Sequence, residues 1–196
     1  MTVLSVNINK LATLRNSRGG NNPDLLQSCR DLISFGAQGI TVHPRPDERH
    51  IKKQDVYDIA ELLKPYPHIE FNIEGYPSSD FLSMLEEVKP AQATFVPDPP
   101  EALTSNAGWK LSENKDLLKD ISDRMRTAGI RSSIFIDAVS FSDKDLEALN
   151  FIHPDRVELY TEDYAKAYQG PEKQSMMSRF SDAAKQVASI DIGINA

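Results

Sequence analysis

Two histidines and two arginines lie close together in the segment 39–51. They follow a short run of β-branched residues that is typical of a strand, so they stand where a strand ends. Pro44 and Pro46 restrict the backbone between them and stiffen the loop. Imidazoles move protons near neutral pH and guanidiniums bind anions, which indicates proton transfer on an anionic substrate. The alternative is a solvated basic turn with one histidine at the edge of the core. The four residues are His43, Arg45, Arg49 and His50.

A second basic segment follows the first expected strand. Lys10, Arg15 and Arg18 precede the pair Gly19 and Gly20. Glycine lets a backbone approach a ligand closely, so this turn could cradle a phosphate. A solvated basic loop is the alternative.

A carboxylate falls inside another expected strand, residues 69–73. Glu70 and Asn72 share one face of that strand, and apolar residues occupy the other. Such a carboxylate is either exposed at a sheet edge or held inside the fold for chemistry. If the sheet closes into a barrel no edge remains, which favours the functional interpretation. Residues 74–77 are expected to turn the chain.

The composition bounds the class of protein. At 196 residues with 40% hydrophobic content, one domain with a sizeable core is expected over residues 1–196. A net charge of −7 argues against a general nucleic-acid or membrane-surface binder. Cys29 is the single cysteine, which excludes an internal disulfide, and it is expected to be a buried, inert thiol. We recognise no signal peptide or membrane span, so a cytoplasmic protein is expected.

Strands and helices are expected to alternate along the whole chain, which is the pattern of a parallel sheet. A doubly wound sheet is possible, but no strand is followed by Gly-x-Gly-x-x-Gly or a P-loop. Polar residues at strand ends instead suit the active face of a (β/α)₈ barrel, with one βα unit missing. These polar residues are Asn7, His43, Glu70, Asp137 and Glu158. The expected strands are residues 4–8, 39–43, 69–73, 91–96, 132–136, 156–160 and 191–196.

Several long motifs carry a family resemblance that extends over nearly the whole chain. They are residues 6–19, 39–51, 71–77, 95–100, 103–109 and 133–137. In these motifs the chain resembles the pyridoxine 5′-phosphate synthase family. The resemblance implies an octameric (β/α)₈ barrel that uses no metal or organic cofactor. It also implies the condensation of 1-deoxy-D-xylulose 5-phosphate with 3-amino-1-hydroxyacetone 1-phosphate, giving pyridoxine 5′-phosphate, phosphate and water.

The resemblance also implies roles for particular residues. It makes His43 an acid–base catalyst and Glu70 the general-base carboxylate. The remaining positions are expected to bind the two phosphorylated substrates: Asn7 and Arg18 for the amino-ketone phosphate, and Arg45, His50 and Thr104 for the deoxyxylulose phosphate. Asn9 and Lys10 replace the Asp-His of many members, so their contact to the sugar phosphate is expected to differ. Residues 160–165 also depart from the family pattern.

The family continues beyond Ala196 with a second catalytic histidine and a phosphate-binding turn. A chain that ended there is expected to be an incomplete barrel with little turnover, and a longer protein is the more economical expectation. One alternative function is a phosphosugar-binding barrel without catalysis. Another is a metal-dependent hydrolase using His43, His50 and Glu70, although their spacing on a proline-rich loop is a weak metal pattern.

Overall fold

The computed structural model describes residues 2–98 and 107–196. The chain divides into two compact units, Met1–Ala93 and Thr94–Ala196. A single domain over residues 1–196 therefore stays a prediction, and each unit is described by itself. The sequence predicts a long loop at residues 103–109, either a lid over a ligand or a plain surface loop, and Thr104 with most of this loop lies outside the described residues.

Seven parallel strands follow one another in chain order, from β1 to β7. In the first unit, Asn7 of β1 pairs with Thr41 of β2, and Val42 pairs with Ile73 of β3. In the second unit, β5 pairs with β6 and β6 with β7. The expected parallel sheet is confirmed. The strands are β1 (Ser5–Asn7), β2 (Gly39–Val42), β3 (Glu70–Gly75), β4 (Gln92–Phe95), β5 (Arg131–Ile136), β6 (Arg156–Leu159) and β7 (Gly193–Asn195).

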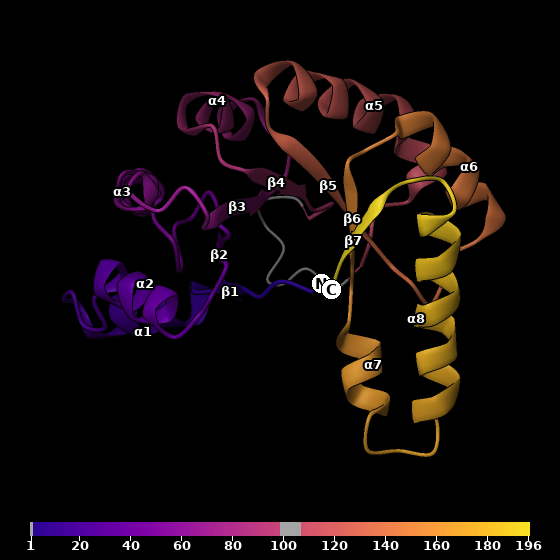
Figure 1. The fold of residues 1–196 in the computed structure, drawn as a ribbon, viewed down its shortest axis with the longest axis horizontal. Helices are drawn as coiled ribbons and strands as arrows, with labels where there is room; N and C mark the ends of the chain where they lie inside the picture. The colour runs from indigo at the N-terminus through magenta and orange to yellow at the C-terminus, as the bar shows by residue number, and fades with distance from the viewer. Residues whose placement is uncertain (1, 99–106) are drawn as a thin grey trace. The chain divides into compact units, whose positions relative to one another are not determined.

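Helices connect the successive strands, as the alternation of patterns predicts (Figure 1). The last connection contains two helices that lie side by side, α7 and α8. The sequence pattern predicts one helix there, at about residues 172–188, which corresponds to α8. The helices are α1 (Asn9–Arg18), α2 (Leu25–Ser34), α3 (Lys53–Leu63), α4 (Ser79–Val88), α5 (Leu111–Ala128), α6 (Asp143–Ile152), α7 (Glu162–Ala167) and α8 (Lys173–Ala188).

Helix starts follow local capping chemistry. The side chain of Ser78 accepts a hydrogen bond from the Phe81 main chain at the start of α4. The sequence predicts a cap at Ser78 or Ser79 and a capping box of Ser142 and Asp145, and the structure confirms the cap at Ser78 and the box at the start of α6. The sequence Asn22-Pro23 predicts a helix with Asn22 as the N-cap, which is wrong, because Asp24 is the N-cap of α2. Its carboxylate accepts from the Gln27 main-chain N–H at 3.0 Å.

The basic segment after β1 is a helix and not the loop that the sequence indicates, whereas phosphate binding by Lys10 and Arg18 stays a prediction. Gly19 ends α1 in the left-handed conformation, with φ of 69°, instead of opening a ligand loop. The sequence did not reveal this helix, because its apolar stripe is weak and its N-cap residue, Ile8, makes no side-chain capping bond. Contacts of Arg15 and Asn16 with the loop after β2 hold it in place.

One glycine in the second unit is required by close packing. A Cβ atom on Gly108 would lie 2.2 Å from the main-chain nitrogen of Asp137. The next residue, Trp109, is buried and donates its indole N–H to the Phe95 carbonyl at 2.9 Å. The end of the loop 103–109 is thereby fixed against β4 and β5.

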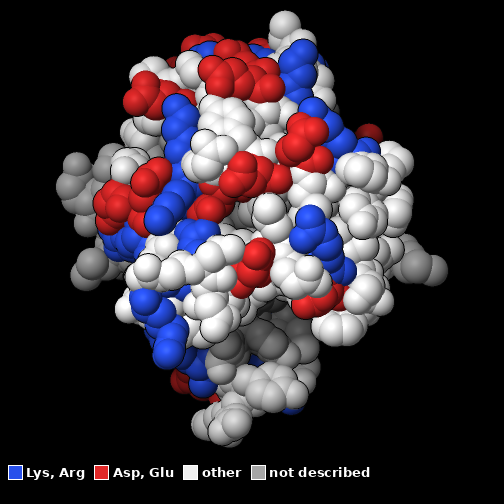
Figure 2. Space-filling view, turned by 90° about the vertical axis from the view of Figure 1, so that its left-hand side faces the viewer, with Lys and Arg blue, Asp and Glu red and all other residues white. Residues whose placement is uncertain are grey.

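Charged side chains do not separate by sign on the face that Figure 2 shows. Lysines and arginines are interspersed there with aspartates and glutamates. On this face, acidic and basic side chains are therefore neighbours.

Candidate active site

The carboxyl ends of the first three strands bring an amide, an imidazole and a carboxylate together. Asn7 ends β1, His43 follows β2, and Glu74 lies near the end of β3. A carboxylate oxygen of Glu74, Oε2, lies 3.5 Å from Asn7 Nδ2 and 3.8 Å from His43 Nδ1. Two of these three residues, Asn7 and His43, were expected in the site from the sequence.

The third member of this cluster was not the expected carboxylate. Glu70 begins β3 and pairs with Gly39, the first residue of β2. Four residues of strand separate it from Glu74, about 13 Å at roughly 3.3 Å per residue. The structure therefore does not bring Glu70 to His43. The sequence does contain a signal for Glu74. Glu70, Asn72 and Glu74 alternate on one strand face, but residues 74–77 were expected to form a turn, so the strand was ended too early.

Asn9 supports the histidine through the main chain. Its Oδ1 accepts a hydrogen bond from the His43 N–H at 2.9 Å, and its own N–H donates to Asn7 Oδ1 at 2.9 Å. The start of α1 is thus tied to the ends of both β1 and β2. Lys10, in the same first turn, is exposed. The expectation that Asn9 and Lys10 contact substrate is untested, but Asn9 has this positioning contact in addition.

His43 is held in its neutral form. The side chain is buried, and burial together with the charges of Arg45, His50 and Arg49 lowers its pKa to about 3. At this pKa the 3.8 Å contact between His43 Nδ1 and Glu74 Oε2 is not an ion pair at neutral pH, and it becomes one only when the imidazole takes up a proton. A neutral imidazole can accept a proton from a substrate, and the adjacent carboxylate would stabilise the imidazolium that results.

The loop after β2 carries the cationic part of the site. Arg45 is buried, and Arg49 forms an ion pair with Asp47 at 2.7 Å. Burial and the charge of Arg45 lower the pKa of His50, and a hydrogen bond to the His43 main chain partly opposes them. In the described part of the chain, His50 Nδ1 is buried without a hydrogen-bond partner. Such an atom is suited to a ligand that brings its own donor or acceptor.

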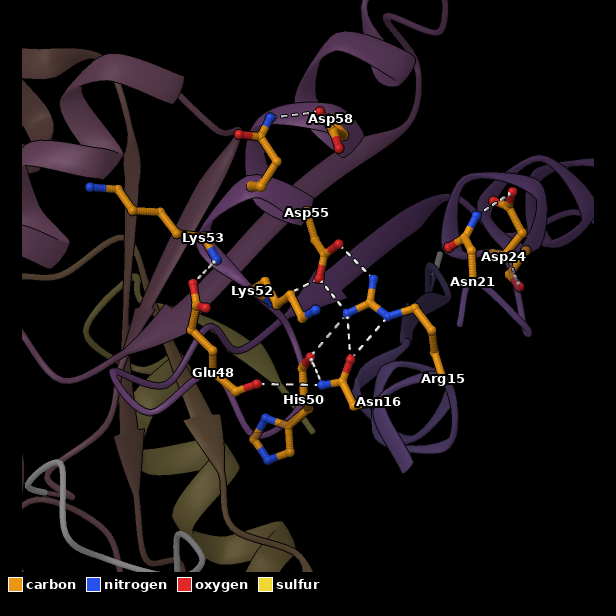
Figure 3. A network of polar contacts seen from close by, with 12 residues as sticks. Arg15, Asn16, Asn21, Asp24, Glu48, His50, Lys52, Lys53, Asp55 and Asp58 are labelled. Carbon is orange, nitrogen blue, oxygen red and sulfur yellow. Dashed lines mark hydrogen bonds and ion pairs between the residues drawn. The ribbon is translucent and has the colours of Figure 1, made fainter. Parts of the chain in front are cut away.

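Two expected anion-binding arginines differ in their surroundings. Arg18 is exposed at the end of α1, so it can reach a ligand from solvent. Arg15 is buried and forms hydrogen bonds with both carboxylate oxygens of Asp55, at 2.6 and 2.8 Å (Figure 3). Its guanidinium therefore binds Asp55 within the protein and is not placed to bind a phosphate.

The second unit contains a buried carboxyl group of its own. Burial raises the pKa of Glu158 to about 7, and a hydrogen bond from Thr94 Oγ1 at 3.4 Å partly opposes it. A carboxyl with this pKa can give or take a proton at neutral pH. Asp137, also noted at a strand end, instead accepts hydrogen bonds from Val139 N and Ser140 Oγ within its own turn.

A second group of polar side chains lies two residues before the cluster of Asn7, His43 and Glu74 along the same three strands. Ser5 Oγ lies 2.7 Å from Thr41 Oγ1, and Asn72 Nδ2 donates to the same oxygen at 3.4 Å. Gln92 Nε2 donates to Asn72 Oδ1 at 3.2 Å. Ser5, Thr41 and Asn72 each precede a member of the cluster by two residues, which places them on the same strand face.

We expect Thr41→Val to lower the free energy of unfolding by about 1–3 kcal/mol, because it removes the oxygen to which Asn72 donates in a buried site. Urea unfolding measures this change. Thr127→Val is the matched control, since Thr127 Oγ1 bonds only the Asp123 carbonyl at an exposed position. Its effect should stay within about 0.5 kcal/mol. Equal losses in the two variants would show that this second group of polar side chains does not stabilise the fold.

Neither a metal cluster nor a membrane helix is found in the described residues. No group of three His, Cys, Asp or Glu side chains there could hold a metal ion, including the set of His43, His50 and Glu70. None of the helices in ranges 2–98 and 107–196 is long and apolar enough to cross a bilayer.

Comparison with known proteins shows the family to which this chain belongs. The family described as pyridoxal phosphate biosynthesis protein PdxJ matches residues 4–196. Pyridoxine 5′-phosphate synthase of Phocaeicola vulgatus is 52% identical over 198 residues, covering all of this chain and 79% of that protein. The proteins of the same name from Bacteroides thetaiotaomicron and Cytophaga hutchinsonii are 50% and 48% identical, with the same coverage.

Solved structures with much lower identity share the fold. Deoxyribose phosphate aldolase from Aeropyrum pernix has a TM-score of 0.61 at 10% identity, over 98% of this chain and 73% of that one. Dihydropteroate synthase from Burkholderia cenocepacia has a TM-score of 0.50 at 12% identity, over 98% and 84%. These likenesses show the fold alone, which is α/β of the TIM-barrel type, as expected.

Proposed function

The chain belongs to the pyridoxal phosphate biosynthesis protein PdxJ family, and on this premise we propose that it is a pyridoxine 5′-phosphate synthase. It condenses 1-deoxy-D-xylulose 5-phosphate with 3-amino-1-hydroxyacetone 1-phosphate. The products are pyridoxine 5′-phosphate, inorganic phosphate and water. The observation that carries the proposal is the cluster of Asn7, His43 and Glu74 beside a cationic loop.

This reaction needs imine formation, repeated proton transfers and the loss of a phosphate. His43, neutral and adjacent to a carboxylate, takes a proton from carbon or nitrogen and returns it at a later step. Glu74, rather than Glu70, is the carboxylate base in this proposal, because only Glu74 lies beside His43.

Cationic and polar side chains bind the phosphate groups of the two substrates in this proposal. Arg45 and His50, together with Thr104, bind the phosphate of the deoxyxylulose phosphate, and Asn7 and Arg18 bind the amino-ketone phosphate. Guanidinium groups suit this task because they match phosphate oxygens with paired N–H donors. Asn9 and Lys10 stand at the start of α1, next to the His43 main chain.

The assembly and compartment are parts of the same proposal. The family resemblance supports an octamer. Exposed apolar side chains such as Phe35, which is 83% exposed, can be buried in contacts between subunits. The acidic composition supports an enzyme that binds neither nucleic acid nor membranes, and we propose a cytoplasmic location because we recognise no signal peptide. Light scattering that gives eight times the protomer mass is the expected result.

We expect the purified protein to form pyridoxine 5′-phosphate and inorganic phosphate when both substrates are present, and neither product when one is omitted. Chromatography of the pyridine product and a phosphate assay measure the two. A chelator should leave the rate unchanged. Binding of 1-deoxy-D-xylulose 5-phosphate with no product would contradict the proposal and favour the phosphosugar-binding alternative.

A further inference from the structure

A buried arginine and its neighbour bind helix α1 to the loop that carries His50 (Figure 3). The Arg15 side chain is 7% exposed, and its guanidinium forms hydrogen bonds with both carboxylate oxygens of Asp55. The same guanidinium donates to the main-chain oxygen of His50 at 3.3 Å. We call Arg15, Asn16 and Asp55 the loop clamp.

Asn16 makes most of the contacts with the loop. Its amide nitrogen donates to the main-chain oxygen of His50 at 2.7 Å, and it lies 3.2 Å from that of Arg49 and 3.4 Å from that of Glu48. Its amide oxygen accepts from Arg15 Nε and Nη2, at 3.1 and 2.9 Å. Arg15 therefore fixes which end of the amide faces the loop, and only a donor fits there.

Asp55 connects the clamp to the next element. Besides binding Arg15, its Oδ2 accepts the Lys52 main-chain N–H at 2.7 Å, at the start of α3. The hydrogen bond with Asp55 raises the pKa of Arg15, so the guanidinium stays charged. One ion pair thus joins the end of α1, the loop 48–52 and the first turn of α3.

The clamp holds His50 by its main chain and does not occupy Nδ1 of its imidazole, while the ring also makes a hydrogen bond to the His43 main chain. Arg15 and Asn16 both donate to the main-chain oxygen of His50 and not to its ring, whose Nδ1 is buried without a hydrogen-bond partner in the part of the chain that the structure describes. The charges of Arg15 and Asp55 cancel within the clamp. It can therefore order the loop without competing for the phosphate of a substrate.

We propose that the loop clamp is a positioning device that sets His50 for the phosphate of 1-deoxy-D-xylulose 5-phosphate. The proposal rests on the substrate-binding role given above to His50. Arg15, Asn16 and Asp55 are positioning residues, since they act through the loop main chain. A merely structural ion pair would stabilise the fold without setting the affinity for one of the two substrates.

Asn16→Asp is the most direct test. The new side chain keeps its size and still accepts from Arg15, but it loses the N–H donors and turns an anion toward main-chain oxygens. We expect Kd and KM for 1-deoxy-D-xylulose 5-phosphate to rise about tenfold, while kcat and KM for the amino-ketone phosphate change little. Calorimetric binding and steady-state kinetics measure these quantities.

A pair of arginine substitutions supplies the control. Arg126 also pairs with an aspartate, Asp123, at 2.6 Å, and donates to the carbonyl of a histidine, His153, at 2.8 Å. Arg15→Lys should weaken deoxyxylulose phosphate binding, because lysine cannot reproduce the two-pronged contact. Arg126→Lys, which removes the same kind of contacts in the second unit, should not.

Hydrogen exchange provides a readout that does not depend on turnover. The main-chain amides of residues 48–53 should exchange faster in Asn16→Asp and Arg15→Lys than in the parent protein or in Arg126→Lys. Unchanged exchange and unchanged Kd in folded variants would overturn the clamp, as would parallel losses of kcat and of both substrate affinities. If the parent protein binds the sugar phosphate but makes no product, the proposed function fails. The clamp is then judged by Kd and exchange alone.

Discussion

Replacing Glu74 by glutamine is expected to lower kcat for pyridoxine 5′-phosphate formation by about 10³-fold, within the range that general acid–base groups contribute. Glutamine keeps the size of the side chain and can still bond Asn7, but it cannot take a proton or stabilise a charged His43. KM should change little, because a carboxylate does not bind the substrate phosphates. Steady-state kinetics at neutral pH, with circular dichroism to confirm folding, measure the effect.

Glu70→Gln is the matched control for this prediction. The two substitutions are chemically identical and lie on the same face of β3, but Glu70 stands at the amino end of the strand, beside Gly39. We expect the Glu70 variant to keep most of the activity. A large loss of kcat in Glu70→Gln with a normal rate in Glu74→Gln would restore the assignment of Glu70 as the base and reject the one drawn from the geometry.

Acid is expected to destabilise the protein through His43 by up to about 5 kcal/mol. The folded state holds this imidazole at a pKa of about 3, whereas the unfolded chain has an ordinary value near 6.5. Between these values the unfolded state binds more protons, so the free energy of unfolding falls as the pH drops below about 6.5. It stops falling through this group only below about pH 3.

The His43→Gln variant isolates this contribution. Urea unfolding of the parent protein and the variant at pH 7 and pH 4 gives two differences in unfolding free energy. The variant should lose about 3 kcal/mol less than the parent between these pH values. His50, whose pKa is also lowered, remains in both proteins and cancels in the comparison. Equal losses would show that His43 is not held neutral by its surroundings.

Local sequence patterns determined much of this protein. Alternating strand and helix patterns predicted the parallel sheet, because hydrophobic period and helix-ending residues are local properties. The capping residues Ser78, Ser142 and Asp145 acted as expected, since a cap needs only its own first turn. The loop of His43, Arg45 and His50 was also evident, because its proline and basic residues are adjacent in the chain.

Tertiary contacts decided the features that depend on distant residues. Helix α1 lacks a strong apolar stripe and is held by the contacts of Arg15 and Asn16 with a loop more than thirty residues away. For the same reason the chain alone could not tell that Arg15 binds Asp55 and not a phosphate.

The choice between Glu70 and Glu74 shows most clearly what a sequence pattern alone does not determine. Period-two alternation puts both carboxylates on one face of β3, so the pattern identifies the face but not the end of the strand. Only the pairing of Val42 with Ile73 reveals that Glu74 stands level with His43 and that Glu70 lies at the other end. Strand register depends on hydrogen bonds between segments far apart in the sequence, and it therefore belongs to the tertiary structure.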